Sequence, residues 1–316
     1  MTITQFSYLI DSKQPLTDSR MRQGWDLFLS AYNDNERVQK PFEGIFASRK
    51  CWWPLPEYNY QSHELPSANV IEVAQQANES EFIGEGLASS GFSASSGQSV
   101  CIDITGFMRP HILYFLKYLK EAGLKQIDMI YTEPEHYSRK AETTFSIDDV
   151  VKVRSVLGYE GQHVPGMDGD ALIVGVGYDH GLMSRVILEK ESARLIQLHC
   201  FPSLSADMYH ESILRLDRVA SASKARDHEY VIFSSANDPF VTAAELSRAY
   251  AKLKGAGLSN LYLSPLATKP HTLGFGLFYL RELEGTASSL IFPFSARYSR
   301  ETGKGLGRSW VYPIIF

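Results

Sequence analysis

Residues 98–316 alternate short apolar runs with helix-length amphipathic segments, and this alternation constrains the fold more than any other feature. Repetition of strand, helix and strand requires right-handed crossovers and produces a mostly parallel sheet with helices on both faces. A set of buried helices is excluded because the apolar runs are short and are bounded by Gly, Pro or Asp. The predicted fold is α/β, with a three-layer, Rossmann-like, mostly parallel sheet. The predicted strands are 98–105, 126–132, 171–177, 194–198, 230–234, 260–264, 289–294 and 310–315.

The helices predicted between these strands follow from apolar residues at helical spacing and from Gly or Pro at their ends. They cover 110–122, 182–190, 206–220, 241–254 and 270–283. The last two strands are joined by a hairpin-like stretch without a helix, so an antiparallel edge is expected there.

The first 85 residues have a different pattern, which predicts a strand over 6–10, a helix over 19–32 and a strand over 45–53. Residues 86–97 then hold five serines and three glycines, a composition typical of a flexible linker or a mobile loop. The predicted organisation is a mixed α/β N-terminal region (1–85), a linker (86–97) and a Rossmann-like core (98–316).

Composition excludes several classes of protein. With 44% hydrophobic and 12% aromatic residues the chain is not disordered, and no apolar run is long enough to cross a membrane. A net charge of -5 disfavours binding of double-stranded DNA. The three cysteines (Cys51, Cys101, Cys200) are too few for a disulfide framework or a zinc site. No signal-peptide pattern is visible at the N-terminus, so we expect a cytoplasmic protein. Separately, we expect neither a metal nor a cofactor.

Polar residues gather after the predicted strands, and ligands of doubly wound sheets bind beyond the carboxyl ends of the strands. Four of these residues could supply a general acid and a general base if they converge, namely Asp103, Glu133, Asp179 and His180. The alternative for Asp179, as for Asp238, is the N-cap of the following helix.

The segment around Thr268 and Lys269 is the strongest candidate for a ligand-binding site. Thr268 can cap a helix in which Pro270 occupies the first turn, so the open N–H groups and the helix dipole would lie beside the Lys269 ammonium. This combination attracts phosphate or carboxylate. The alternative is an ordinary capped helix with a solvated lysine.

Other candidate ligand contacts lie in loops. Residues 295–308 form a basic, Gly-rich loop that could close over a polyanion, although a plain surface hairpin needs no ligand. Hydrogen bonds to phosphate or ribose could come from further loop residues, whose alternative is ordinary loop polarity. The candidates are Thr105, Gly106, Tyr137 and Ser138 for hydrogen bonds, and Arg297, Arg300 and Lys304 for charge.

Several familiar patterns are absent or incomplete. The run GVGYDHG (175–181) has the glycines of a dinucleotide fingerprint but no carboxylate at the end of the next strand, so tight turn packing explains it better. The Ser of GFSAS (91–95) lacks the context of a hydrolase nucleophile. The RxxxxH spacing at 194–199 falls on a predicted strand and is interpreted as chance. No chemistry can be assigned to the stretches 33–38 and 52–60. The aromatic, proline-rich 52–60 suggests packing of the N-terminal region on the core, and the alternative is binding of a partner.

Residues 98–316 resemble the CRISPR-associated Rossmann-fold sensor domains. The resemblance rests on a late strand followed by a Thr-Lys motif that opens a helix, here Thr268-Lys269; the family carries two glycines before the motif, where this chain has Leu266-Ala267. The family implies a homodimer that binds a cyclic oligonucleotide, with Thr268 and Lys269 on the phosphate and Thr105 and Gly106 on the facing wall. Such domains typically carry an attached effector; because no nuclease motif is visible in this chain, an effector would be a separate protein or would lie unrecognised in residues 1–85.

The resulting hypothesis is a sensor of a phosphorylated, nucleotide-like ligand in a bacterial antiviral defence or stress system. One alternative is an enzyme, a hydrolase or transferase, that acts on a nucleotide-type substrate at the same edge of the sheet. A second alternative is an interaction scaffold whose polar edge is incidental.

Overall fold

The computed structural model describes residues 3–73, 78–136, 152–205, 208–220, 230–300 and 303–316. The chain divides into two compact units, which are treated separately below. Unit 1 comprises Met1–Ile10 and Thr143–Ser295, and unit 2 comprises Asp11–Glu142 and Ala296–Phe316.

Unit 1 contains a six-stranded sheet in the order β6-β11-β10-β7-β8-β9. All neighbouring pairs are parallel except β6 and β11. These strands are short and their central members are buried on both faces, as a parallel sheet covered by helices requires. Their bounds are β6 Lys152–Ser155, β7 Ala171–Gly175, β8 Arg194–Cys200, β9 Tyr230–Ser234, β10 Leu261–Pro265 and β11 Ser288–Phe294.

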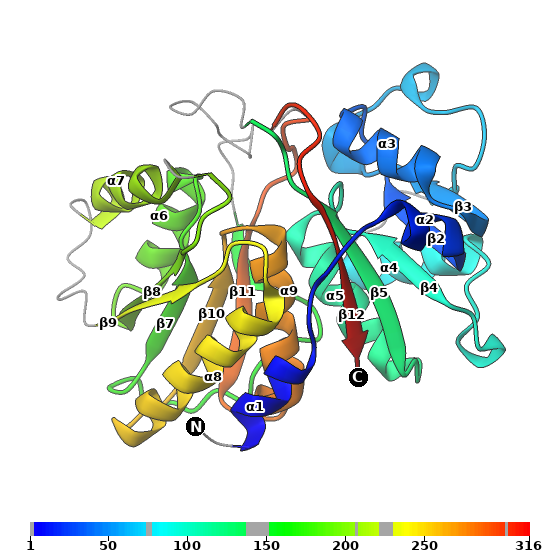
Figure 1. The fold of residues 1–316 in the computed structure, drawn as a ribbon. Coiled ribbons are helices and arrows are strands. Elements are labelled where there is room, and N and C mark those ends of the chain that lie inside the picture. The colour runs from blue at the N-terminus through cyan, green and yellow to red at the C-terminus, as the bar shows by residue number, and fades with distance from the viewer. Residues whose placement is uncertain (1–2, 74–77, 137–151, 206–207, 221–229, 301–302) are drawn as a thin grey trace. The chain divides into compact units, whose positions relative to one another are not determined.

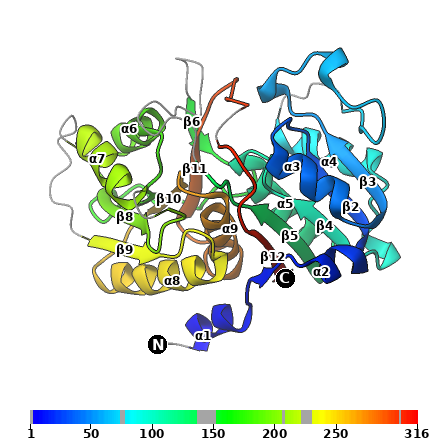
Figure 2. The same ribbon diagram turned by 45° about the horizontal axis from the view of Figure 1, so that its top comes forward.

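Helices cover both faces of this sheet (Figures 1 and 2). Helices α6 and α7 pack together on one face, and α8 and α9 pack together on the other. Helix α1 packs against α8, and the hydroxyl of the buried Tyr8 donates to Oε1 of Glu282, in the turn after α9, at 2.9 Å. The bounds are α1 Ile3–Ile10, α6 His180–Glu189, α7 Met208–Ala220, α8 Pro239–Gly255 and α9 Lys269–Phe278, with a π-helical turn over Tyr279–Leu283.

The strand order fixes where the chain reverses direction in unit 1. From β7 it proceeds through β8 to β9 on one side, and then crosses back to β10 and β11 on the other side. The topological switch point therefore lies between the carboxyl ends of β7 and β10. In open α/β sheets this is the place where ligands bind.

Unit 2 contains a second six-stranded sheet, in the order β1-β12-β5-β4-β2-β3. Strands β3, β2, β4 and β5 are parallel, β12 is antiparallel to β5, and β1 is antiparallel to β12. The switch point of this sheet lies between β2 and β4. The strands are β1 Gln14–Pro15, β2 Trp25–Ala31, β3 Ala47–Trp53, β4 Val100–Asp103, β5 Gln126–Thr132 and β12 Ser309–Ile315.

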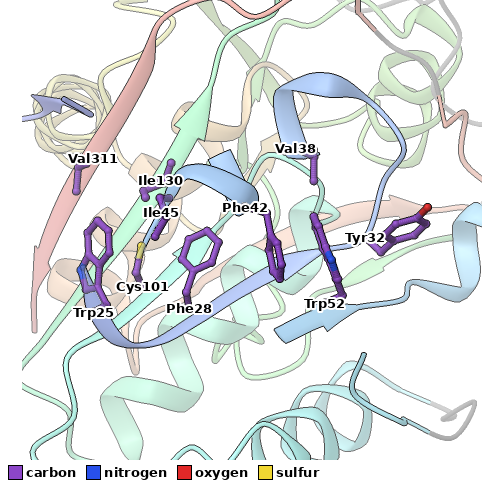
Figure 3. Close-up of a cluster of buried hydrophobic side chains, with 10 residues drawn as sticks. All are labelled: Trp25, Phe28, Tyr32, Val38, Phe42, Ile45, Trp52, Cys101, Ile130 and Val311. Carbon is purple, nitrogen blue, oxygen red and sulfur yellow. The ribbon is translucent and has the colours of Figure 1, made fainter. Parts of the chain in front are cut away.

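The helices of unit 2 enclose two apolar layers. One layer is the cluster of Figure 3, in which the rings of Phe42 and Trp52 stack at 3.6 Å. In the other layer Trp53 meets Phe107 and Phe115 edge to face. The helices are α2 Asp18–Gln23, α3 Glu36–Gly44, α4 Glu79–Ser89 and α5 Arg109–Glu121, with short 3₁₀ turns at Pro56–Tyr58, Ser62–Glu64 and Ala94–Ser96.

The predicted α/β class with a mostly parallel, Rossmann-like arrangement is confirmed. The division of the chain differs from the one predicted, because β4, β5 and β12 pair with the N-terminal strands and leave 152–294 to form the other sheet. Residues 86–97 therefore lie inside unit 2: 86–89 form the end of helix α4, and 90–97 belong to the connection from that helix to β4. The closing strand β12 is antiparallel as expected, but its partner is β5 and not the strand before it.

Two predictions for the N-terminal region are wrong. Residues 6–10 belong to helix α1, not to a strand, and the helix predicted over 19–32 is instead α2 followed by β2. Gly24, with a φ of 71°, ends α2, and the apolar residues after it form a buried strand. Among the described residues, no helix is long and apolar enough to span a membrane.

Candidate functional site

The Thr-Lys segment follows β10 and opens helix α9, as predicted, and this position is the switch point of unit 1. Thr268 is the N-cap of α9: its Oγ1 accepts from the backbone N–H of His271 at 3.3 Å and donates to the carbonyl of Ala236. Lys269 is the first residue of α9 and is half-buried. The positive end of the α9 dipole and the Lys269 ammonium therefore belong to the same turn.

The loop after β7 reaches the same switch point. Asp179 is the buried N-cap of α6 and accepts from the N–H of Leu182 at 3.1 Å, which confirms the capping alternative. His180 follows as an exposed first residue of the helix. The structure thus brings Thr268, Lys269, Asp179 and His180 to neighbouring strand ends of one sheet.

Two buried polar atoms lie near these strand ends. Within the described part of the chain, Ser264 Oγ on β10 and His199 Nδ1 on β8 have no hydrogen-bond partner. Ser264 is fully buried, and its register with Val174 and Gln197 places it on the face that α6 covers. His199 approaches Gln197 Oε1 with Nε2 at 3.0 Å, and burial lowers its pKa to about 4. Buried polar atoms of this kind are sites for a water molecule or a ligand.

The other predicted residues lie at the carboxyl edge of unit 2, so the single edge predicted for all of them is in fact two edges. Asp103 is fully buried and accepts from the N–H of Thr105 at 2.9 Å and from the Ser30 hydroxyl at 3.2 Å. Thr105 Oγ1 accepts from the N–H of Thr132. A Cβ at Gly106 would lie 2.6 Å from the carbonyl oxygen of Ala31, so this glycine allows the loop after β4 to approach the end of β2 closely.

Glu133 is buried and paired within unit 2. Its Oε1 accepts from Trp310 Nε1 at 2.7 Å, and its Oε2 lies 3.3 Å from Arg308 Nε. The predicted acid–base group of four is therefore divided between two sheets, with Asp103 and Glu133 on one and Asp179 and His180 on the other.

The basic loop also belongs to unit 2, and its central arginine is engaged. Arg300 donates to Glu64 Oε1 and to the carbonyl of Tyr58, each at 2.7 Å, and its guanidinium lies over the Tyr60 ring. Lys304 pairs through its backbone with His136, with an exposed side chain. Arg297 is exposed, and Tyr137 and Ser138 lie outside the described residues.

Residues 33–38, to which the sequence analysis assigned no chemistry, begin helix α3 and form hydrogen bonds with the basic loop of unit 2. Asn35 is the N-cap of α3 and donates to the carbonyl of Gly303, while Asn33 donates to the carbonyl of Arg300 at 3.2 Å. Arg37 follows in the first turn of α3 and is buried. Asn in the N-cap position before a charged first turn was the signal in the sequence for this helix start.

Metal binding was not expected, and the described residues contain no group of three or more His, Cys, Asp or Glu side chains arranged to hold a metal ion. Comparison with known proteins provides no family assignment: no family model matches the chain, and no curated protein matches it either.

Proposed function

We propose that unit 1 binds a phosphorylated, nucleotide-like ligand at the switch point between β7 and β10. The observation that carries this proposal is the convergence of two helix starts, α6 and α9, on neighbouring strand ends, with Lys269 as the first residue of α9. A helix start with an adjacent ammonium favours phosphate.

The chemistry of the two helix starts suggests how the ligand is oriented. Lys269 and the dipole of α9 favour a phosphate on the β10 side. The Asp179 carboxylate repels a phosphate on the β7 side but accepts hydrogen bonds from hydroxyl groups. A ligand with phosphate at one end and ribose at the other satisfies both. Ser264 Oγ, which has no hydrogen-bond partner among the described residues, lies on the α6 face of the same sheet.

The resemblance to CRISPR-associated Rossmann-fold sensors supports the same ligand class and extends the proposal to a homodimer, a cyclic oligonucleotide, a separate effector protein and a role in cytoplasmic antiviral defence. In this chain the glycines that permit close backbone approach precede α6 rather than α9: a Cβ at Gly177 would lie 2.0 Å from the Leu266 carbonyl oxygen.

The test is binding by calorimetry and thermal unfolding with mononucleotides, cyclic dinucleotides and cyclic oligonucleotides, followed by chromatography of the ligand. We expect a ligand-dependent rise in Tm without consumption of the ligand. Lys269→Ala should weaken binding about tenfold or more, as expected for a charged group on phosphate. The matched control is Lys254→Ala, since Lys254 lies in the last turn of α8, at the opposite edge of the same sheet.

Each outcome distinguishes the hypotheses. Unchanged affinity of Lys269→Ala would remove the site at α9. Conversion of a nucleotide would support the enzyme alternative, and absence of binding together with a co-purifying protein would support the scaffold.

A further inference from the structure

A thiol and a neutral imidazole meet at the carboxyl edge of unit 1, on the sheet face covered by α8 and α9. Cys200, the last residue of β8, is half-buried, and its Sγ lies 3.8 Å from His271 Nδ1 and 3.7 Å from Nε2. His271, in the first turn of α9, is fully buried. The ligand site proposed above uses neither of these side chains.

A chain of hydrogen bonds determines which ring nitrogen of His271 carries the proton. The Thr242 hydroxyl donates to the carbonyl of Asp238 at 2.9 Å, so Thr242 Oγ1 accepts from the Ser234 hydroxyl at 3.1 Å. Ser234 Oγ then accepts from His271 Nε2 at 3.0 Å. The carbonyl of Ser235, 3.1 Å from Nε2, can also only accept.

The proton therefore resides on Nε2, which leaves the lone pair of Nδ1, 3.8 Å from the thiol sulfur, as the acceptor on the ring. Burial lowers the pKa of His271 to about 4, so the ring is neutral at ordinary pH, and it can take the thiol proton only because the thiolate that forms beside it stabilises the imidazolium. A nucleophile, a base and a group that orients the base are the components of an activated cysteine.

We propose that Cys200 is a nucleophilic thiol, activated by His271 and oriented through Ser234 and Thr242, that forms a covalent adduct with small carbon electrophiles at this edge of unit 1. With iodoacetamide as the probe, the thiol proton passes to His271 Nδ1 while the sulfur lone pair forms the S–C bond. The C–I bond breaks, iodide leaves with the electron pair, and the imidazolium returns its proton to water.

The test measures the rate of iodoacetamide alkylation at each cysteine by mass spectrometry in the intact chain. Cys51 and Cys101 are buried in unit 2 and serve as internal references for a shielded thiol. We expect Cys200 to react first and faster than glutathione at the same pH. Replacement of the base by His271→Asn should slow Cys200 about tenfold or more.

A second variant keeps the imidazole and changes only its orientation. Thr242→Val removes the acceptor for the Ser234 proton, so the Ser234 hydroxyl competes with the Ser235 carbonyl at His271 Nε2 and part of the population shifts the ring proton to Nδ1. Alkylation of Cys200 should slow several-fold while circular dichroism shows unit 1 folded. The proposal is overturned if Cys200 reacts no faster than glutathione, or if folded Thr242→Val and His271→Asn proteins both retain the original rate.

Discussion

Gly177 lies against Leu266 so closely that a Cβ on the glycine would be 2.0 Å from the Leu266 carbonyl oxygen. The contact joins the loop after β7 to the loop after β10 at the switch point of unit 1. The contact explains the glycine at 177 by the tight packing of two loops, so no bound dinucleotide is needed to account for it. Because Gly177 provides the space for this packing, the Thr-Lys motif can follow Leu266-Ala267 instead of two glycines.

Gly177→Ala should therefore destabilise unit 1 by about 3 kcal/mol, because a backbone carbonyl cannot move aside as a flexible side chain can. Urea unfolding measures the change. The control is Gly255→Ala at the end of α8, where a Cβ would meet open space and a helical Ala should be neutral or slightly stabilising. Equal stabilities for the two variants would contradict this account of the contact.

The pairing of Arg300 with Glu64 predicts a structural effect where the sequence suggested a ligand contact. Arg300→Ala removes an ion pair of 2.7 Å and a bond to the Tyr58 carbonyl, and it should lower the stability of unit 2 by about 1–2 kcal/mol. Nucleotide affinity should be unchanged.

Lys40→Ala is the control for Arg300→Ala, because Lys40 forms an exposed ion pair with Glu36 whose loss should leave the stability of unit 2 almost unchanged. Both variants are compared by urea unfolding and by calorimetry with the ligand. A loss of nucleotide affinity in Arg300→Ala without a loss of stability would restore the predicted role of this arginine.

The two buried histidines predict a loss of stability in mild acid. Burial lowers the pKa of both His199 and His271 from 6.5 to about 4, so the unfolded chain binds their protons first as pH falls. Stability is complete above pH 6.5 and declines toward pH 4. Between pH 7.5 and 5.5 each histidine should contribute a loss of about 1.4 kcal/mol.

Denaturant unfolding at both pH values measures this loss. His199→Gln should show a smaller pH dependence than the original chain, whatever its absolute stability, because glutamine does not titrate. His180→Gln is the control, since His180 is exposed. If His199→Gln and the original chain lose equal stability, protonation of His199 is not the cause.

The sequence predicted local structure well where turn residues bound a short apolar run. Strands β5 and β9 occupy the predicted 126–132 and 230–234. Thr268, Asp179 and Asp238 are N-caps, and the sequence indicates such caps because a short polar side chain reaches only the N–H groups of the next turn. Such features depend on neighbours in the chain.

Long-range pairing could not be predicted in the same way. Leu27 on β2 pairs with Val100 on β4, which places the N-terminal strands in one sheet with residues assigned to the core. Arg300 and Glu64 are 236 residues apart, and Cys200 and His271 are 71 apart. Hydrophobic periodicity indicates that a strand is buried, but it does not identify the partner strand.

The role of Asp179 can be tested with a substitution that separates capping from acid–base chemistry. Asparagine caps a helix as well as aspartate does but cannot act as a general acid or base. Asp179→Ala should therefore destabilise unit 1 by about 1 kcal/mol, whereas Asp179→Asn should retain stability. Asp238→Ala, at the start of α8, is the matched cap and should lose a similar amount, because Asp238 accepts from two first-turn N–H groups at 3.1 Å. Thermal unfolding of the three variants measures these effects. If the protein turns over a nucleotide and Asp179→Asn abolishes that turnover while the fold is intact, the carboxylate acts in catalysis and the role assigned to it here as a cap is incomplete.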